Sequence, residues 1–177
     1  MKTLGAIFVG AAALSGCAAT YQGPASGSTA TLTVRQAGEE GNAYFNVYKD
    51  RVCAPHPAGQ RFYTTMGTFG AATQKVAAGQ EFVLTGTWSK IGAAVGYRCS
   101  ATASFVPEEG MTYVATIAAD MKANRCTLSI AEQVAGGTRP VASFRKNTDL
   151  CFGPDNLGAA KNGVFDNIQA GATTITR

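Results

Sequence analysis

The five cysteines are the residues of this chain whose chemistry is easiest to predict. Cys17 differs from the other four because an uncharged run and the small residues Ser15 and Gly16 come directly before it. A thiolate is a strong nucleophile that readily takes an alkyl group, and small neighbours leave the backbone open to a peptidase. We therefore predict that Cys17 is a site of covalent modification.

The segment 1–16 is built like a secretory signal peptide. Lys2 supplies a positive start, Leu4–Leu14 is apolar and uncharged, and small residues precede Cys17. The apolar run is about half as long as the roughly 20 residues that a transmembrane helix needs. We therefore expect residues 1–16 to be removed rather than to remain as a membrane-spanning helix.

The motif Leu14-Ser15-Gly16-Cys17 resembles a lipobox, the cleavage motif of bacterial lipoproteins. The resemblance implies a diacylglyceryl group on the Cys17 sulfur, cleavage before Cys17, and acylation of the new amino terminus with a fatty acid such as palmitate. Two or three acyl chains hold a protein firmly on a membrane, whereas one chain does so marginally. In Gram-negative lipoproteins an aspartate after the cysteine retains the protein in the inner membrane. Ala18 stands at that position here, so for a Gram-negative source the resemblance implies the outer membrane, on its periplasmic face or at the cell surface.

The composition is that of an exported globular domain of ordinary size, with 177 residues, of which 46% are hydrophobic and 15% charged. The formal net charge of +4 is mild, and no cluster of Lys and Arg indicates a nucleic-acid partner. A weak attraction to anionic lipid or polysaccharide is compatible with this charge. The expected partners are the membrane, through the lipid on Cys17, and an envelope protein or polysaccharide.

The four other cysteines are Cys53, Cys99, Cys126 and Cys151, and in an exported protein they are expected to form two disulfides. No pair has the CxxC spacing of a zinc or redox site, so we predict no metal site. In a simple meander, a third strand would lie between the two strands that carry Cys99 and Cys126 and would separate these residues by about 10 Å. A disulfide needs Cα atoms within roughly 7 Å. This argues against Cys99–Cys126. The shorter loops favour Cys53–Cys99 with Cys126–Cys151 over Cys53–Cys126 with Cys99–Cys151.

Alternating apolar and polar residues, separated by Gly and Pro turns, predict an all-β fold. We expect about seven to nine short strands in an antiparallel β-sandwich, immunoglobulin-like or transthyretin-like, or in a partly closed barrel. The small residues of Thr68–Gly79 leave that stretch unassigned. The expected strands are Thr31–Arg35, Tyr44–Tyr48, Arg61–Met66, Glu81–Trp88, Val95–Val106, Met111–Ala119, Arg125–Ala131 and Val141–Arg145.

The chain therefore divides into four parts. Residues 1–16 form the signal peptide, 17–29 the lipidated cysteine and a flexible tether, 30–152 the sandwich domain, and 153–177 a Gly/Asn-rich tail that we expect to be loosely held. The tether is rich in Gly, Ser and Ala, which predicts a coil with a mean span of roughly 20 Å.

The stretch Lys75–Glu132 resembles other small, mostly uncharacterised bacterial lipoproteins in its layout of turns and strands. Here the layout comprises Val76-Ala77-Ala78-Gly79, then Phe105-Val106-Pro107-Glu108-Glu109-Gly110, then Tyr113. The resemblance supports the β-rich fold and implies no activity.

Few side chains offer catalytic chemistry. His56 is the only histidine, but it lies between two prolines and has no assignable nucleophile, so a loop histidine is the favoured interpretation. Glu108 and Glu109 are neighbours in a turn, where both side chains are expected to point into water. Trp88 is either a ligand platform or, as we favour, part of the core.

Aromatic residues offer one further candidate surface. Tyr44, Tyr48 and Tyr63 either form an exposed aromatic surface for a sugar or protein, or stabilise cross-strand pairs.

The function predicted from these features is that of a membrane-anchored envelope lipoprotein whose domain has a non-enzymatic binding or structural role. The alternatives are an inhibitor of an envelope hydrolase and an uncharacterised hydrolase. No cofactor is expected.

Overall fold

The computed structural model describes residues 20–49, 59–64, 70–91, 95–123, 125–147 and 173–176. Within these segments no helix is long and apolar enough to cross a bilayer. The strands are β1 (Thr29–Gly38), β2 (Asn42–Tyr48), β3 (Gln60–Thr64), β4 (Ala71–Ala77), β5 (Phe82–Ile91), β6 (Val95–Phe105), β7 (Thr112–Asp120), β8 (Arg125–Val134), β9 (Gly137–Pro140), β10 (Arg145–Asn147) and β11 (Thr173–Thr176).

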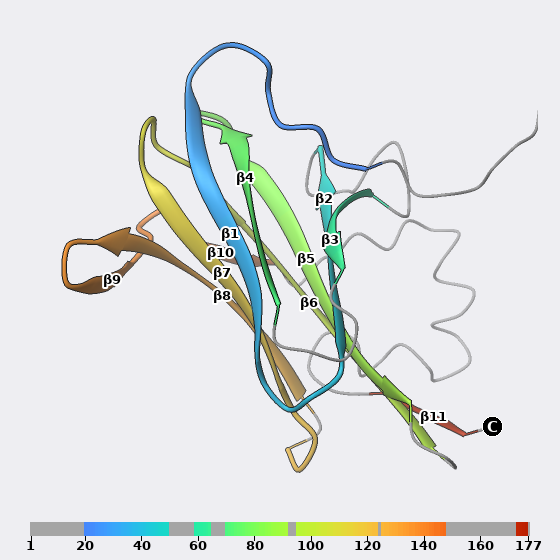
Figure 1. The fold of residues 1–177 in the computed structure, drawn as a ribbon. Coiled ribbons are helices and arrows are strands. Elements are labelled where there is room, and N and C mark those ends of the chain that lie inside the picture. The colour runs from blue at the N-terminus through green and yellow to red at the C-terminus, as the bar shows by residue number, and fades with distance from the viewer. Residues whose placement is uncertain are drawn as a thin grey trace, which may run out of the picture.

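Two sheets are stacked face to face (Figure 1), which confirms the predicted β-sandwich. Sheet A has the order β10-β6-β5-β2-β3, and sheet B has the order β4-β1-β7-β8-β9. Within this arrangement β1 and β7 run parallel, while the other paired strands run antiparallel. The two sheets are separate in the described residues and do not form a closed barrel.

The core lies between the sheets because alternate residues of each strand point inward. The residues expected on the inner face are buried in the core, namely Phe82, Leu84 and Trp88 of β5 and Cys99 and Phe105 of β6. The outward residues of these strands are largely buried as well, among them Val83, Thr85, Thr87, Thr102 and Ser104, so the expected exposed face is not observed there. Sheet B contributes Ala30, Leu32, Val34, Tyr113, Ala115, Ile117, Leu128 and Ile130.

A glycine in β5 brings the two sheets close together. A Cβ added at Gly86 would lie 3.1 Å from Cβ of Ile117, which comes from the facing sheet. A larger residue at this position would therefore have to push the sheets apart.

Sequence patterns missed two edge strands. In β4 the residues are small and polar and only Val76 is buried, while all four residues of β9 are exposed. Edge strands with so little buried surface carry a weak apolar signal. Gly136, with φ of 88°, forms the turn that returns the chain from β8 to β9.

The C-terminal tail departs in part from expectation. Thr173–Thr176 pairs antiparallel with the segment of β6 from Val95 to Arg98. The remainder of the segment 153–177 lies outside the described residues.

The structure joins Cys99 to Cys126, with Cα atoms 5.7 Å apart. Our prediction against this pairing was wrong. The two alternatives that we retained, Cys53–Cys99 with Cys126–Cys151 and Cys53–Cys126 with Cys99–Cys151, were therefore wrong as well. The error came from the assumed meander: β6 lies in sheet A, whereas β7 lies in sheet B. The turn around Pro107–Gly110 crosses between the sheets, so Cys99 and Cys126 face each other through the core.

Peptide mapping under non-reducing conditions should yield a peptide that joins Cys99 to Cys126. Cys53 and Cys151 lie outside the described residues, but the cysteine count then predicts a second peptide that joins them. Replacing Cys99 and Cys126 together by Ala should lower the free energy of unfolding by about 3.5 kcal/mol for a sequence separation of 27 residues, measured by urea denaturation. A peptide joining Cys99 to Cys53 or to Cys151 would contradict the sandwich topology.

Candidate functional site

A pocket of about 420 Å³ opens at the end of the sandwich where β2 ends and β5 begins. This volume is within the range of small-molecule sites. Its described walls combine three aromatic rings with amide and charged side chains: Tyr21, Val47, Tyr48, Lys49, Gly59, Gln60, Ala77, Gln80, Glu81 and Phe82.

Tyr21 reaches the pocket because the N-terminal segment packs against the domain. Thr20 forms a bridge with Arg61, and the Tyr21 amide donates to the Arg61 carbonyl at 2.8 Å. The Tyr21 ring stacks on Phe62 at 5.2 Å and meets Phe82 edge-on at 6.0 Å.

The flexible tether that we expected over residues 17–29 is therefore interrupted by a packed segment. Thr20 and Tyr21 belong to the packed domain. The only aromatic residue in that stretch, Tyr21, was the sequence signal that could have indicated this.

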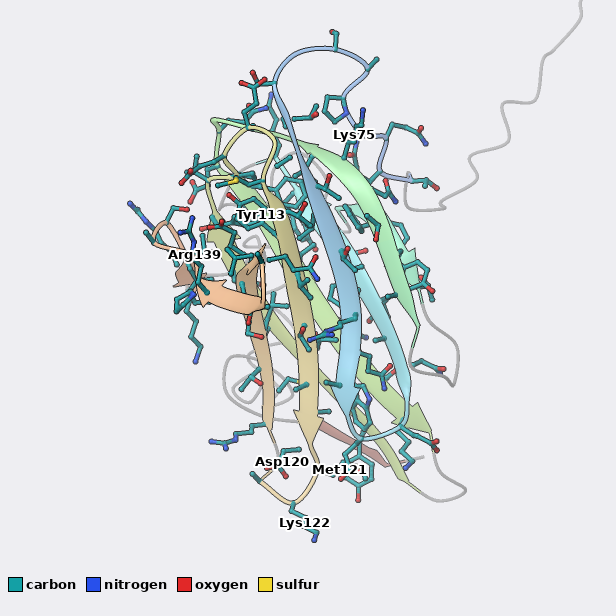
Figure 2. All side chains as sticks on the ribbon, turned by 60° about the vertical axis from the view of Figure 1, so that its left-hand side comes forward. Lys75, Tyr113, Asp120, Met121, Lys122 and Arg139 are labelled. Carbon is teal, nitrogen blue, oxygen red and sulfur yellow. A yellow bond between two sulfur atoms is a disulfide. The ribbon has the colours of Figure 1, made fainter. Side chains whose placement is uncertain are left out.

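The same segment lies between the edges of the two sheets. The Tyr21 hydroxyl donates to the carbonyl of Lys75 on β4 at 3.3 Å, and Figure 2 shows Lys75 beside the N-terminal segment. Gly23 is required by this close approach, because an added Cβ would lie 2.7 Å from the Lys75 oxygen. Gln74 Nε2 of β4 also donates to the Phe62 carbonyl of β3 at 3.0 Å. This side of the sandwich is thus closed by non-covalent contacts.

Tyr48 forms a second wall of the pocket and packs against Val83 on the outer face of sheet A. Gly59, with φ of 62°, supports it closely: an added Cβ would lie 2.9 Å from the Tyr48 ring. Burial raises the pKa of both Tyr48 and Tyr21, so both phenols are neutral hydrogen-bonding groups at neutral pH.

An aromatic and cationic cluster lies on the outer face of sheet A. The Tyr44 ring has the Arg61 guanidinium carbon 4.7 Å from its centroid and that of Arg98 at 5.7 Å. Arg98 is exposed, as the alternation of β6 predicted. Arg61 is 37 positions away in the sequence, so no local pattern indicated that the two would converge.

The predicted aromatic candidates have different positions. Trp88 is fully buried, which confirms core packing and excludes a ligand platform. Tyr44 and Tyr48 lie on the outer face of sheet A, while Tyr63 packs against the core, so the three do not form one surface.

The predicted polar candidates offer no catalytic arrangement in the described chain. Glu108 and Glu109 are exposed in the turn between β6 and β7, as expected. His56 and Cys17 lie outside the described residues. Among those that are described, no group of three His, Cys, Asp or Glu residues could hold a metal ion.

Comparison with protein-family models and with curated protein sequences finds no match to this chain. A functional proposal must therefore be argued from the pocket, the cluster and the N-terminal segment.

Burial of the pocket tyrosines predicts a loss of stability at high pH. The ordinary pKa of tyrosine is 10.0, and in the folded chain the pKa of both residues is raised above it. Below pH 10 this difference does not affect the free energy of unfolding. Above pH 10 the free energy of unfolding falls, because the tyrosines of the unfolded chain ionise first. Urea denaturation from pH 8 to 11 should show this loss, and it should be smaller in Tyr21→Phe. An equal loss in Tyr21→Phe would contradict the burial of Tyr21.

Proposed function

We propose that this chain is a lipid-anchored envelope lipoprotein whose sandwich domain binds a ligand without catalysis. The observation that carries the proposal is that Tyr21 lines the pocket and follows Cys17 by only four positions. A pocket held this near to an anchored terminus suits a protein that binds a component of the envelope that surrounds it.

The walls of the pocket favour a saccharide. Tyr21 and Tyr48 offer apolar ring surface for the C–H faces of a sugar, while Gln60 and Gln80 offer amides for its hydroxyl groups. A few polar groups among aromatic walls are typical of small-ligand sites. Envelope polysaccharide is therefore the partner class that we propose.

The polar contacts beside the pocket support a binding role. Ser104 donates its hydroxyl to Glu81 Oε1 at 2.8 Å, a contact that helps to hold the Glu81 carboxylate at the pocket. Lys49 supplies a cation for an acidic sugar.

Lipid attachment can be tested with Cys17→Ser. Metabolic labelling with a fatty acid should label the wild-type chain and leave Cys17→Ser unlabelled as an uncleaved precursor, because the alkylated atom is the Cys17 sulfur. In a Gram-negative source, fractionation should place the wild type with outer-membrane markers. Label remaining on Cys17→Ser, or wild type found with inner-membrane markers, would contradict the corresponding part of the proposal.

Saccharide binding can be tested by calorimetric titration with short neutral and acidic oligosaccharides released from envelope polysaccharide. Gln80→Ala should weaken binding about fivefold, the loss of one hydrogen bond of roughly 1 kcal/mol. Gln133→Ala is the matched control, because Gln133 is exposed on β8 of sheet B and distant from the pocket residues in the strand order. Absence of wild-type binding to both oligosaccharide classes, or an equal effect of the two substitutions, would contradict the saccharide site.

A further inference from the structure

The Arg61–Tyr44–Arg98 cluster brings together two like charges from opposite parts of sheet A. Arg61 comes from β3 and Arg98 from β6, with β5 and β2 between them. The guanidinium carbons of the two arginines lie 4.7 and 5.7 Å from the centroid of the Tyr44 ring, so both contact the same tyrosine. The negative face of an aromatic ring attracts cations and offsets part of their mutual repulsion.

Neither guanidinium has a carboxylate partner among the described residues. Arg61 donates to Asn46 Oδ1 and to Thr64 Oγ1, each at 2.9 Å, and both acceptors are neutral. These two bonds hold Arg61 in place without neutralising it. Arg98 is exposed and contacts the Tyr44 ring. Within the described part of the chain the cluster therefore presents two positive charges without a carboxylate partner, an arrangement suited to an anion.

The cluster is also close to the start of the domain. Thr20 bridges to Arg61, and the Tyr21 amide donates to the Arg61 carbonyl. Cys17 precedes Thr20 by three positions, so an extended chain between them reaches about 10 Å. A lipid on Cys17 would consequently hold Arg61 near the headgroups of the bilayer that contains it.

We propose that Arg61, Tyr44 and Arg98 bind the phosphate groups of anionic phospholipids in the anchoring bilayer. Arginine pairs with phosphate through two parallel hydrogen bonds, and tyrosine favours the membrane interface because its ring is apolar and its hydroxyl polar. The nearness of the cluster to a bilayer rests on the proposed anchoring through Cys17, whereas the affinity for phosphate belongs to the cluster itself.

The test uses the chain from residue 17 with Cys17→Ser, which carries no lipid. Its binding to vesicles of phosphatidylcholine with 30% phosphatidylglycerol is compared with its binding to phosphatidylcholine alone, by co-sedimentation. The unlipidated chain should bind the anionic vesicles more strongly. Arg61→Gln with Arg98→Gln should weaken this binding about 20-fold, since each basic residue near an anionic surface contributes roughly fivefold.

The matched control is Arg35→Gln with Arg139→Gln, which removes the same charge from exposed positions of sheet B. It should change binding by less than about threefold, because distant charges are screened. Arg98→Gln alone should weaken binding about fivefold, and it keeps the folded contacts of Arg61 if the double variant fails to fold.

Equal losses in the two double variants, or no preference of the unlipidated chain for anionic vesicles, would overturn the headgroup site. Binding to an acidic oligosaccharide that requires Arg61 and Arg98, without vesicle binding, would overturn it as well. Fatty-acid labelling of Cys17 is unaffected by any of these results, so failure of the headgroup site and failure of the anchor are distinguishable.

Discussion

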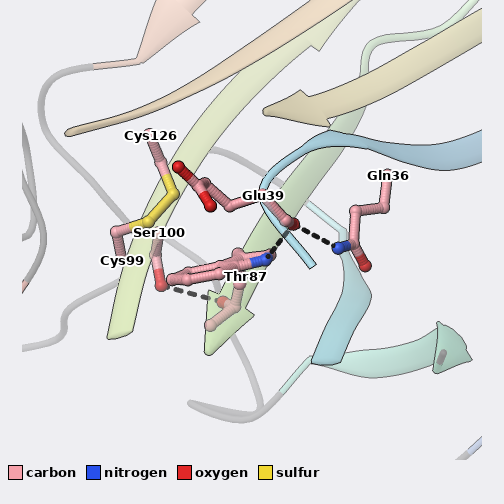
Figure 3. The surroundings of a disulfide bond; sticks show 7 residues. Gln36, Glu39, Thr87, Cys99, Ser100 and Cys126 are labelled. Carbon is pink, nitrogen blue, oxygen red and sulfur yellow. Dashed lines mark hydrogen bonds between the residues drawn. A yellow bond between two sulfur atoms is a disulfide. The ribbon is translucent and has the colours of Figure 1, made fainter. Parts of the chain in front are cut away.

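The bond between Cys99 and Cys126 crosses the core and joins the inner faces of the two sheets. Trp88 is the cross-strand neighbour of Cys99, and its indole N–H donates to the Glu39 carbonyl at 3.1 Å. The same carbonyl accepts a hydrogen bond from Gln36 Nε2 at 2.8 Å, and Figure 3 shows Glu39 between the disulfide and Gln36. The covalent link, the buried indole and the turn from β1 to β2 thus form one unit. This unit fixes the relative position of the two sheets at one end of the sandwich.

The side of the sandwich that carries β3 and β4 has no such covalent link among the described residues. Closure there depends on Tyr21, whose ring fills the space beside Phe62 and Phe82 and whose hydroxyl reaches the carbonyl of Lys75. Aromatic contacts of this kind contribute about 0.5–1.5 kcal/mol each beyond the area they bury. Segments held by few contacts open at lower free energy than the core, so this side is the one most able to respond to a ligand.

Much of the fold could be predicted because strand alternation is a local property. The strands expected over Glu81–Trp88 and Val95–Val106 correspond to β5 and β6, and those expected over Met111–Ala119 and Arg125–Ala131 correspond to β7 and β8. The connection from β6 to β7 could not be predicted, because Pro107–Gly110 suits a hairpin and a crossing between sheets equally well. The disulfide error followed directly from that ambiguity.

The candidate site was less predictable, because its parts are distant in the sequence. Arg98 was expected on an outward face, but nothing local to Arg61 or Tyr44 indicated that three strands would bring these side chains together. The pocket was missed for a similar reason. The Gly, Ser and Ala content around Tyr21 is typical of a flexible linker, and only tertiary contacts overrule that composition.

The position of Tyr21 couples the two proposed activities of this protein. A ligand that fills the pocket contacts Tyr21. Where this contact exists only while Tyr21 is packed against the domain, ligand binding stabilises the docked N-terminal segment. When that segment is docked, Cys17 lies only three positions before the first docked residue, Thr20. This short stretch limits the distance between the domain and a bilayer that holds a lipid on Cys17. Since linkage is reciprocal, a bilayer that stabilises the docked segment also increases the population of the state in which Tyr21 lines the pocket. The packing of one aromatic ring would thereby connect ligand binding to the distance between the domain and the bilayer in which we propose that it is anchored.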